Sequence, residues 1–341
     1  MKSRELAEMM PEVFLKILFV LAVADPPAYA QDKVLIAYGG HNETVVPMWV
    51  GIEKGLFRKH GLDVRMLQVR SGQMILSTLA SGSVQAVWPA PSSILNAVSG
   101  GLKVACVASG SNRIPRELLV QKEMKSIEDL RGRLFGVQSI GGGMWLRAMI
   151  VLENLGVDVD RYQLKMRVVG DDAMVSQALI TGNIDAAILP YSFSSLVKRA
   201  GLRSLADTAE IKAPFQGSTL CFQRSTIESS PDLILRLLKG LVEALVFVLD
   251  PSDKAPVTEI LRKNLRLAKA EDVEASYRVL RLMTTLDVSP NPEAWRAMQR
   301  IVTRLNPKVG QVDLGSVLNG TFARSLEESG FLPEMRKKLA R

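Results

Sequence analysis

The sequence predicts an α/β protein with two Rossmann-like lobes, two strands that cross between them, and a helical C-terminal extension. Three observations carry this prediction. Apolar strands alternate with helices from residue 34 to residue 225, one segment of that pattern recurs one hundred residues later, and the last third of the 341-residue chain has helical periodicity only. Two similar halves suit a chain of this length, for which two domains are the natural expectation.

The recurring segment is the strongest of these observations. Residues 79–90 read LASGSVQAVWPA, and residues 179–190 read LITGNIDAAILP, with identical Leu, Gly and Ala at matching positions. The similarity extends upstream to the apolar runs 34–40 and 134–140 and to a G-x-D-V sequence in each half. Internal repeats decide the architecture of a chain, so two copies of one β-α-β-α-β unit are expected.

Residues 1–30 are expected to lie outside the fold. They carry basic residues, an apolar run at 13–24 that only Lys16 interrupts, and the small-x-small sequence Ala28-Tyr29-Ala30. These features are typical of a secretory signal peptide cleaved after Ala30, which predicts a periplasmic protein. The run is short for a membrane span, which needs ~20 apolar residues. A retained membrane anchor is the alternative.

Composition excludes several function classes. The net charge is +8, but Lys and Arg are dispersed along the chain without a dense basic cluster, so no nucleic-acid binding is expected. The two cysteines, Cys106 and Cys221, lie in apolar strands, where we expect two buried free thiols; a disulfide is the alternative in an oxidising compartment. With two cysteines and two histidines, no metal site and no cofactor are expected.

The first unit begins with a strand that ends in two glycines. Pro47 then opens a helix that Gly61 ends, since proline suits a first helical turn and glycine a left-handed cap. Ser71 begins the next helix. In order, the unit is predicted as strand 34–40, helix 48–60, strand 62–69, a helix from Ser71-Gly72-Gln73, strand 84–90, helix 94–101 and strand 103–110.

The second unit follows a crossing between the lobes at residues 109–122. Ser126 and Asp129 have the spacing of a capping box, with Asp in place of Glu. Residues 203–217 are predicted to be irregular and to lead into the return crossing. The elements expected in this half are strand 134–140, helix 144–156, strand 164–169, helix 172–181, strand 184–189, helix 194–201 and strand 217–225.

The remainder is predicted to be helical and to pack on the first lobe. Ser230 caps a long apolar helix that Pro231 starts, and further helices are expected at 253–266, 270–282, 291–305 and 322–340. The predicted domains are therefore the signal peptide 1–30, the first part of lobe 1 at 31–115, lobe 2 at 116–215, and a return strand with the helical region at 216–341.

Three segments of the chain resemble a known family. PMWVGIEKGLF (47–57) with HGLDV (60–64), LASGSV (79–84) and SIEDLRGRLFG (126–136) are similar to motifs of the periplasmic substrate-binding proteins of the nitrate, taurine, aliphatic-sulfonate and thiamine-precursor type, also called NMT1/THI5-like. Gln85 stands where the family usually has Asp. The resemblance covers roughly residues 34–250.

This resemblance implies a type II periplasmic-binding-protein fold. Its two lobes would close by hinge motion on a small solute, which the protein, expected to be a monomer, would deliver to an ABC permease in the inner membrane. The expected role is binding, not catalysis. Two alternatives remain: an exported sensor that reports ligand occupancy to a membrane receptor, and an enzyme like the thiamine-pyrimidine synthases, whose cysteine-rich motif this chain lacks.

Ligands in open α/β sheets bind outside the carboxyl ends of the strands, which selects the strand-to-helix loops. Gly and Ser at helix N-termini could hold an organic anion through backbone N–H groups, without a buried Lys or Arg. The predicted ligand-binding residues are Gly40, His41, Asn42, Ser71, Gly72, Gln73, Trp88, Ala90, Ser92, Ser139, Gly141, Gly142, Gly143, Asp171, Pro190, Tyr191 and Gln216.

Aromatic residues divide between binding and structural interpretations. Trp88 and Tyr191 end corresponding strands and could clamp a ligand from both lobes, or they could be ordinary rim or core aromatics. Trp145, one turn into its helix, could face the cleft or the core, and the core is the favoured interpretation. His41 could donate a hydrogen bond to an anion or simply be solvated. Neither histidine has the partners of a catalytic triad, so no catalytic residue is assigned.

Overall fold

The computed structural model describes residues 31–69, 71–209 and 211–340. The predicted signal peptide, residues 1–30, lies outside the described residues. From Asp32 onward the chain forms one compact unit, so the predicted boundaries between the lobes stay predictions. Within the described residues, no helix combines the length and the apolar character that a membrane crossing requires.

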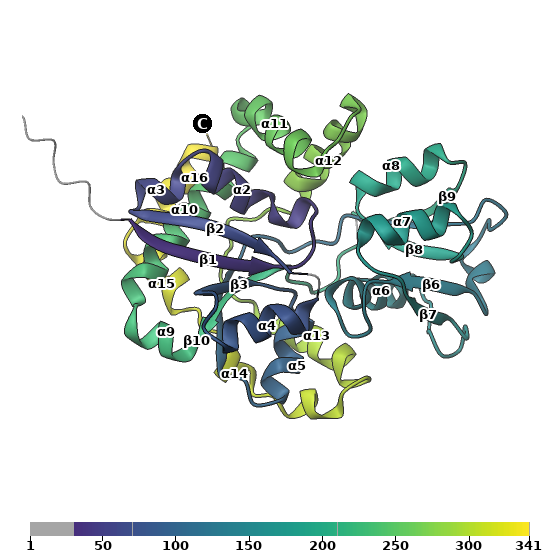
Figure 1. The fold of residues 1–341 in the computed structure, drawn as a ribbon, viewed down its shortest axis with the longest axis horizontal. Helices are drawn as coiled ribbons and strands as arrows, with labels where there is room; N and C mark the ends of the chain where they lie inside the picture. Colours follow the sequence, from purple (N-terminus) through teal and green to yellow (C-terminus); the bar gives the residue numbers. More distant parts are fainter. Residues whose placement is uncertain (1–30, 70, 210, 341) are drawn as a thin grey trace, which may run out of the picture. The chain divides into compact units, whose positions relative to one another are not determined.

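The first sheet has five strands in the order β2-β1-β3-β10-β4 (Figure 1). β1 pairs in parallel with β2 and β3, whereas β10 is antiparallel to both of its neighbours. β10 therefore enters the sheet from the opposite direction, as a return crossing should. The strands are β1 (Asp32–Tyr38), β2 (Leu62–Gln68), β3 (Ala86–Trp88), β4 (Val104–Ser109) and β10 (Thr219–Gln223).

The second sheet has the same arrangement, in the order β7-β6-β8-β5-β9. β6 is parallel to β7 and β8, and β5, which follows the first crossing, is antiparallel to β8 and β9. Strand β9 lies within residues 203–217, which were predicted to be irregular. It is an exposed edge strand with few apolar residues, so its sequence shows little periodicity. The strands are β5 (Glu117–Val120), β6 (Leu134–Val137), β7 (Lys165–Val168), β8 (Ala186–Leu189) and β9 (Arg203–Asp207).

The two sheets confirm the predicted duplication. Each strand of the first sheet has a counterpart at the same position in the second: β7 for β2, β6 for β1, β8 for β3, β5 for β10 and β9 for β4. The registers correspond too, since Ala37 pairs with Leu67 in the first sheet and Val137 pairs with Val168 in the second. The predicted fold class, two α/β lobes with two crossing strands and a helical extension, is confirmed.

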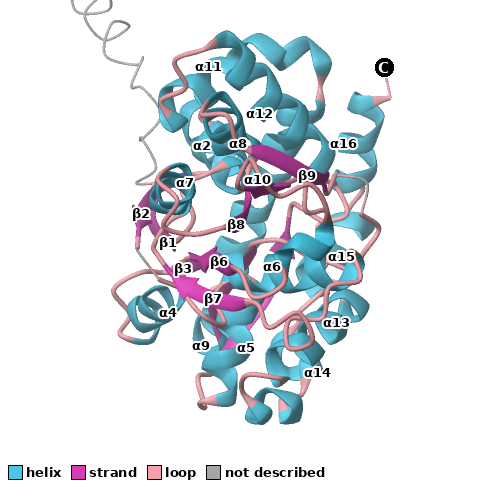
Figure 2. Ribbon diagram, turned by 90° about the vertical axis from the view of Figure 1, so that its right-hand side faces the viewer, coloured by secondary structure: helices cyan, strands magenta, loops and turns pink. Residues whose placement is uncertain are grey.

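Helices flank both sheets (Figures 1 and 2). Alternate residues of β1 point to opposite faces: Val34 and Ile36 pack against α2 and α10, whereas Ala37 belongs to the core under α4 and α5. The helices of the first lobe are α2 (Val46–Glu53), α3 (Leu56–Lys59), α4 (Gly72–Ala80) and α5 (Pro91–Ser99), after the 3₁₀ helix η1 (Glu43–Val45).

One predicted helix of the first lobe is divided in two. The helix expected over 48–60 stops at Glu53, because Gly55 adopts a left-handed conformation with φ of 68° before α3 begins. Gly61, also left-handed at 73°, ends α3 as predicted. Apolar periodicity alone continues through Gly55 and therefore missed the break.

The helices of the second lobe match their predicted positions. Ser126 and Asp129 form the predicted capping box at η2 (Ile127–Leu130), and Asp129 accepts hydrogen bonds from the backbone N–H groups of Lys125 and Ser126, which lowers its pKa. The α-helices are α6 (Gly143–Asn154), α7 (Asp172–Ile180) and α8 (Tyr191–Arg199).

The C-terminal region is helical, as predicted, but the last expected helix is two. Gly330, with φ of 80°, separates α15 from α16. The α-helices are α9 (Arg224–Ser229), α10 (Pro231–Leu249), α11 (Lys254–Leu265), α12 (Ala270–Met283), α13 (Pro292–Thr303), α14 (Leu314–Val317), α15 (Thr321–Glu328) and α16 (Phe331–Leu339), with the 3₁₀ helices η3 (Pro251–Asp253) and η4 (Pro307–Gln311).

These C-terminal helices contact both lobes, not only the first as predicted. α10, α15 and α16 pack on the first lobe beside α2 and α3. α12 packs on α8, and α13 packs on both α5 and α6, so two helices reach the second lobe. Arg199 of α8 donates two hydrogen bonds to the buried Asp272 carboxylate of α12, at 2.7 and 2.9 Å, which fixes one of these contacts.

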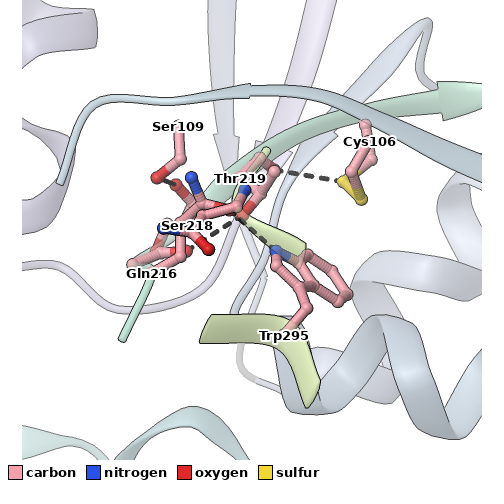
Figure 3. The surroundings of a disulfide bond; sticks show 9 residues. Cys106, Ser109, Gln216, Ser218, Thr219 and Trp295 are labelled. Carbon is pink, nitrogen blue, oxygen red and sulfur yellow. Dashed lines mark hydrogen bonds between the residues drawn. A yellow bond between two sulfur atoms is a disulfide. The ribbon is translucent and has the colours of Figure 1, made fainter. Parts of the chain in front are cut away.

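Cys106 and Cys221 form a disulfide, which corrects the expectation of free thiols (Figure 3). The sequence did not reveal that the return strand β10 inserts beside β4. In that antiparallel ladder Cys221 lies directly opposite Cys106, where two cysteine side chains meet. The disulfide therefore joins the return strand to the edge strand of the same sheet.

Candidate functional site

A small cavity lies between the carboxyl ends of the two sheets and is lined by residues of both lobes. It measures about 50 Å³, room for a few water molecules. Segments that follow β1, β2, β3, β6 and β7 supply most of its walls, which is the location that open α/β sheets favour for ligands. The predicted ligand-binding residues that line it are Gly40, Asn42, Ser71, Gly72, Trp88, Ala90 and Gly143.

Local hydrogen bonds place the first-lobe side of the cavity. Asn42 caps η1 by accepting from the Thr44 backbone N–H at 3.1 Å, and Ser71 caps α4. The Trp88 indole donates to the Thr44 carbonyl oxygen at 3.2 Å, so its ring is fixed against the same loop. Gly72 must be glycine, because a Cβ there would lie 1.9 Å from the Ser93 hydroxyl oxygen.

The lobes contact each other directly around the cavity. The Asn42 amide donates to Asp172 of α7 at 2.7 Å, and the Ser192 backbone N–H donates to Glu43 at 3.2 Å. A Cβ on Gly143 would lie 2.6 Å from the Ala90 methyl group, so this approach of the two loops needs glycine. Glycine and small side chains thus allow the facing loops to meet.

Two arginines in the cavity wall were not predicted. Arg116, 5% exposed, lies on the crossing segment before β5, and Arg147 lies on α6, one turn after Gly143. The sequence analysis considered an anion held by backbone N–H groups without a buried Lys or Arg, whereas the cavity wall contains these two arginines. The spacing of Arg147 four residues after the glycine run was a usable signal, whereas nothing local marked Arg116.

The two guanidinium groups have different partners. Arg116 has the Asp172 carboxylate at 3.5 Å. Arg147 donates to the Gly143 carbonyl oxygen at 3.1 Å and lies 5.7 Å from the centre of the Phe215 ring, and within the described residues it makes no ion pair with a carboxylate. Burial, with repulsion from Arg116, lowers the pKa of Arg147 to about 9, so it is charged at neutral pH.

The carboxylates of the site are already engaged. Asp172 accepts from Asn42 and faces Arg116, and Glu43 accepts from Ser192. Burial raises the pKa of the Glu43 carboxyl, which is 2% exposed. With one carboxylate matched to Arg116 and the other favouring its neutral form, the unmatched charge of the cavity is the Arg147 cation.

His41 and Gln216 were predicted as ligand contacts but have structural partners instead. The Nε2 of His41 is 2.9 Å from the Asn264 carbonyl oxygen, and its Nδ1 is 3.0 Å from the Tyr38 hydroxyl. The Gln216 amide oxygen accepts from the Trp295 indole at 2.8 Å, a contact that Figure 3 shows beside the disulfide. Neither side chain lines the cavity.

Tyr191 does not face Trp88 across the cavity, so the geometry does not support a two-sided aromatic clamp. Trp88 lines the cavity, whereas Tyr191 is buried on the α8 side, where burial and the nearby Asp207 carboxylate raise its pKa. Trp145 is a core residue, as expected.

Several further predicted contacts also lie outside the cavity lining. Asp171 is the N-cap of α7 and Gly142 the N-cap of α6, so both position helices that reach the site. The predicted residues that do not line the cavity, besides the three above, are Gln73, Ser92, Ser139, Gly141, Gly142, Asp171 and Pro190.

Comparison with known proteins agrees with this arrangement. The family model described as NMT1/THI5 like matches residues 42–255, which is more than half of the chain. The chain belongs to the NMT1/THI5-like family. The resemblance inferred from the sequence motifs is thereby confirmed.

Relatives of this NMT1/THI5-like protein are binding proteins. A Brucella abortus (strain 2308) protein named as a binding protein is 28% identical over 227 residues, which cover 65% of this chain and 68% of that protein. The periplasmic aliphatic sulphonate binding protein SsuA from Escherichia coli has the same fold, with 21% identity, a TM-score of 0.66, and coverage of 82% of this chain and 94% of SsuA.

A second solved structure with this fold is the periplasmic nitrate-binding protein NrtA from Synechocystis PCC 6803. It is 12% identical, has a TM-score of 0.70, and the similarity covers 88% of this chain and 89% of NrtA. At these identities the two structures establish the fold of the NMT1/THI5-like chain, and its own cavity residues must indicate the ligand.

Proposed function

We propose that this protein is the solute-binding subunit of an ABC importer and that it captures a small organic anion between its two lobes. The family, the relative named as a binding protein, and the fold shared with sulphonate-binding and nitrate-binding proteins support a binding role. The arginines of the cavity support an anionic solute.

Arg147 is the observation that carries the proposal. A partly buried guanidinium without a carboxylate partner is unfavourable, and an anion that enters the cavity would supply the missing interaction. The N-terminus of α6, which begins at Gly143, adds backbone N–H groups on the same side. The solute's anionic group is placed between these groups and Arg116.

The first-lobe contacts of the solute are proposed from the cavity lining. Asn42 and Ser71 supply polar groups, Gly72 lets the backbone come close, and Trp88 covers one side. Gly40, Ala90 and Gly143 complete the predicted contacts that line the cavity. A solute bound here would touch both lobes and so favour the conformation in which they meet.

The hinge is proposed at the two crossing segments. They run side by side, since the Gly217 N–H donates to the Ser111 carbonyl oxygen at 2.9 Å and the Thr208 N–H donates to the Arg116 carbonyl oxygen at 2.8 Å. Rotation about this pair would open the cavity, and a solute that bridges the lobes would shift the population toward the closed form.

Export to the periplasm is part of the proposal. The Cys106–Cys221 disulfide is the state expected in an oxidising compartment, and the structural neighbours named above are periplasmic. Cleavage of residues 1–30 after Ala30, a monomeric state and delivery to an inner-membrane permease complete the proposed role.

The test is anion binding by the purified protein, measured by thermal shift and calorimetry with nitrate and short alkanesulfonates. Arg147→Ala should weaken binding about 10- to 100-fold, because a charge-assisted hydrogen bond contributes about 1.5–3 kcal/mol. Arg296→Ala removes the same charge from an exposed position of α13 and should leave the Kd unchanged. Equal effects of the two substitutions, or no anion binding at all, would overturn the proposal.

A further inference from the structure

A second chamber adjoins the cavity behind its arginines. Thr44, Arg116 and Arg147 line both spaces, so the two meet at the guanidinium groups.

Half of the residues that line this chamber are apolar, and the polar half consists of Glu43, Thr44, Ser111, Arg113, Arg116 and Arg147. Arg147 lies over the Phe215 ring there, so one side of its guanidinium faces polar groups and the other faces an apolar surface. Val279 and Met283, 1% and 5% exposed, come from α12 of the C-terminal region. The apolar lining residues are Ile114, Pro115, Pro190, Phe215, Val279 and Met283.

From this juxtaposition we infer that Met283 and Val279 set the length of the apolar body that a bound anion can extend past Arg147 into the chamber. The inference rests on the proposed function and adds the residues that select among its solutes.

The charges of the site favour a single negative charge. Asp172 and Glu43 are engaged by Asn42 and Ser192, and Asp172 also faces Arg116, which leaves Arg147 as the unmatched group in the interior. Arg113, which also lines the chamber, is exposed to solvent. A zwitterion would bring an ammonium group with no free carboxylate to meet it. An uncharged solute would leave Arg147 without a counter-ion.

The size of the chamber favours a short chain. It measures about 10 Å³, space for about one water molecule, so an apolar group enters only if the lining moves. Met283 is the side chain best able to do so, because methionine is unbranched and flexible. Val279 is β-branched and stiff, and it sets the limit beyond Met283.

The residues that would select the solute lie outside the part of the chain that the family model matches. The family match ends at residue 255, whereas the two α12 residues lie beyond it. The wall that would measure the solute is thus supplied by the C-terminal helices and not by the matched two-lobe region.

The first test uses the unaltered protein and straight-chain alkanesulfonates of one to six carbons, with nitrate as an anion that has no apolar body and taurine as a zwitterion. Calorimetry should give a Kd that tightens roughly three- to fourfold per methylene, the effect of burying about 0.8 kcal/mol of apolar group, and then weakens once the chamber is full. Taurine should bind more weakly than ethanesulfonate.

The second test changes the wall. Met283→Ala should move the tightest-binding sulfonate to a chain one or two carbons longer, and Val279→Leu should move it to a shorter one, while the Kd for nitrate stays within about twofold. Met335→Ala is the matched control, since this methionine is equally buried in the first-lobe core away from the chamber. It should lower the melting temperature without changing the chain-length profile.

The outcomes separate this inference from the proposed function. If nitrate and all the sulfonates bind equally, or if Met283→Ala and Met335→Ala leave the same profile, the apolar chamber has no role and only this inference fails. If no anion binds to any variant, the proposed function fails with it. The unaltered protein and Val279→Leu also test whether the chamber selects the chain length of the solute. The inference can therefore still be refuted if Met283→Ala does not fold.

Discussion

At the scale of single residues, the site is defined by a balance of two cations and two carboxylates. Arg116 and Asp172 face each other, Glu43 is buried against the Ser192 N–H, and Arg147 has no carboxylate partner. The protonation of Glu43 therefore decides whether the cavity carries a net positive charge.

Glu43 should make anion binding depend on pH. Its folded-state pKa is raised by burial, so it keeps its proton to a higher pH than an exposed carboxyl does and loses it as the pH rises through the raised value. Below that pH Glu43 is neutral, so the site has one negative charge fewer to repel the anion. The Kd for methanesulfonate, whose own charge is constant, should therefore weaken by up to about tenfold as the pH rises, since a unit charge nearby is worth on the order of 1–2 kcal/mol.

Glu43→Gln provides the comparison for this dependence. Glutamine keeps an oxygen that can accept from the Ser192 N–H but carries no charge, so its Kd should stay near the acidic value of the unaltered protein at every pH. The same raised pKa implies that Glu43 favours folding below its unfolded-state pKa and that this contribution is lost as the pH rises through the folded value. A Kd that varies identically with pH in both proteins would assign the effect to another group.

At the scale of elements, the packing of α10 on the first lobe depends on glycine. Phe57 of α3 is 1% exposed and lies between two helices: a Cβ on Gly240 of α10 would lie 2.5 Å from its ring, and one on Gly51 of α2 would lie 2.4 Å from it. The absence of side chains at these two positions lets α2, α3 and α10 approach one another.

Gly240→Ala should destabilise the protein by about 1–3 kcal/mol in urea denaturation, because the added methyl group overlaps the ring. The loss is expected although alanine is favoured over glycine in a helix by about 1 kcal/mol. In a Phe57→Leu background the same substitution should cost clearly less. Additive effects of the two changes would mean that the overlap with Phe57 is not the cause.

Most elements could be predicted because their signals are local. Alternation of strands and helices, the Ser126–Asp129 capping box and the repeat all depend on short stretches of sequence. The helix breaks at Gly55 and Gly330 were missed, because a glycine inside an apolar helical pattern does not by itself indicate a left-handed conformation. The edge strand β9 was missed because an exposed strand has little apolar patterning.

The site was predicted less completely because it depends on which strands become neighbours. Loops after parallel strands follow from topology, and seven of the predicted residues line the cavity. Arg116 and the Cys106–Cys221 disulfide depend on antiparallel crossing strands whose position in the sheet has no local signature. Gln216 was predicted as a ligand contact, and its bond to the Trp295 indole has no local signal because the two residues lie 79 positions apart in the chain.

At the scale of the whole molecule, α12 connects the second lobe to the C-terminal helices. Arg199 of α8 reaches two carboxylates of α12: Asp272, which is 5% exposed, and Glu271, which is exposed. The two ion pairs share one arginine and differ in burial. Comparing them measures how much more a buried ion pair contributes to the folding free energy than a surface one does.

Asp272→Ala should cost about 1–3 kcal/mol of folding free energy, because it removes two hydrogen bonds from a charged group at a buried position. Glu271→Ala should cost about 0–1 kcal/mol, the usual range for a surface pair. Chemical denaturation of both variants measures the difference. Equal losses would show that α12 is not held to α8 mainly through Asp272.

The antiparallel β10 has a consequence for how the chain can be cut. Thr219 is paired with Ser109 in the ladder, so the ends of the long excursion through the second sheet are already side by side. A tight turn could replace residues 110–218 and convert β4 and β10 into a simple hairpin, stapled by Cys106 and Cys221. The second sheet is in this sense an insertion at one turn of the first. Excision of residues 110–218 should leave a protein that keeps its disulfide but has lost the second-lobe wall of the cavity.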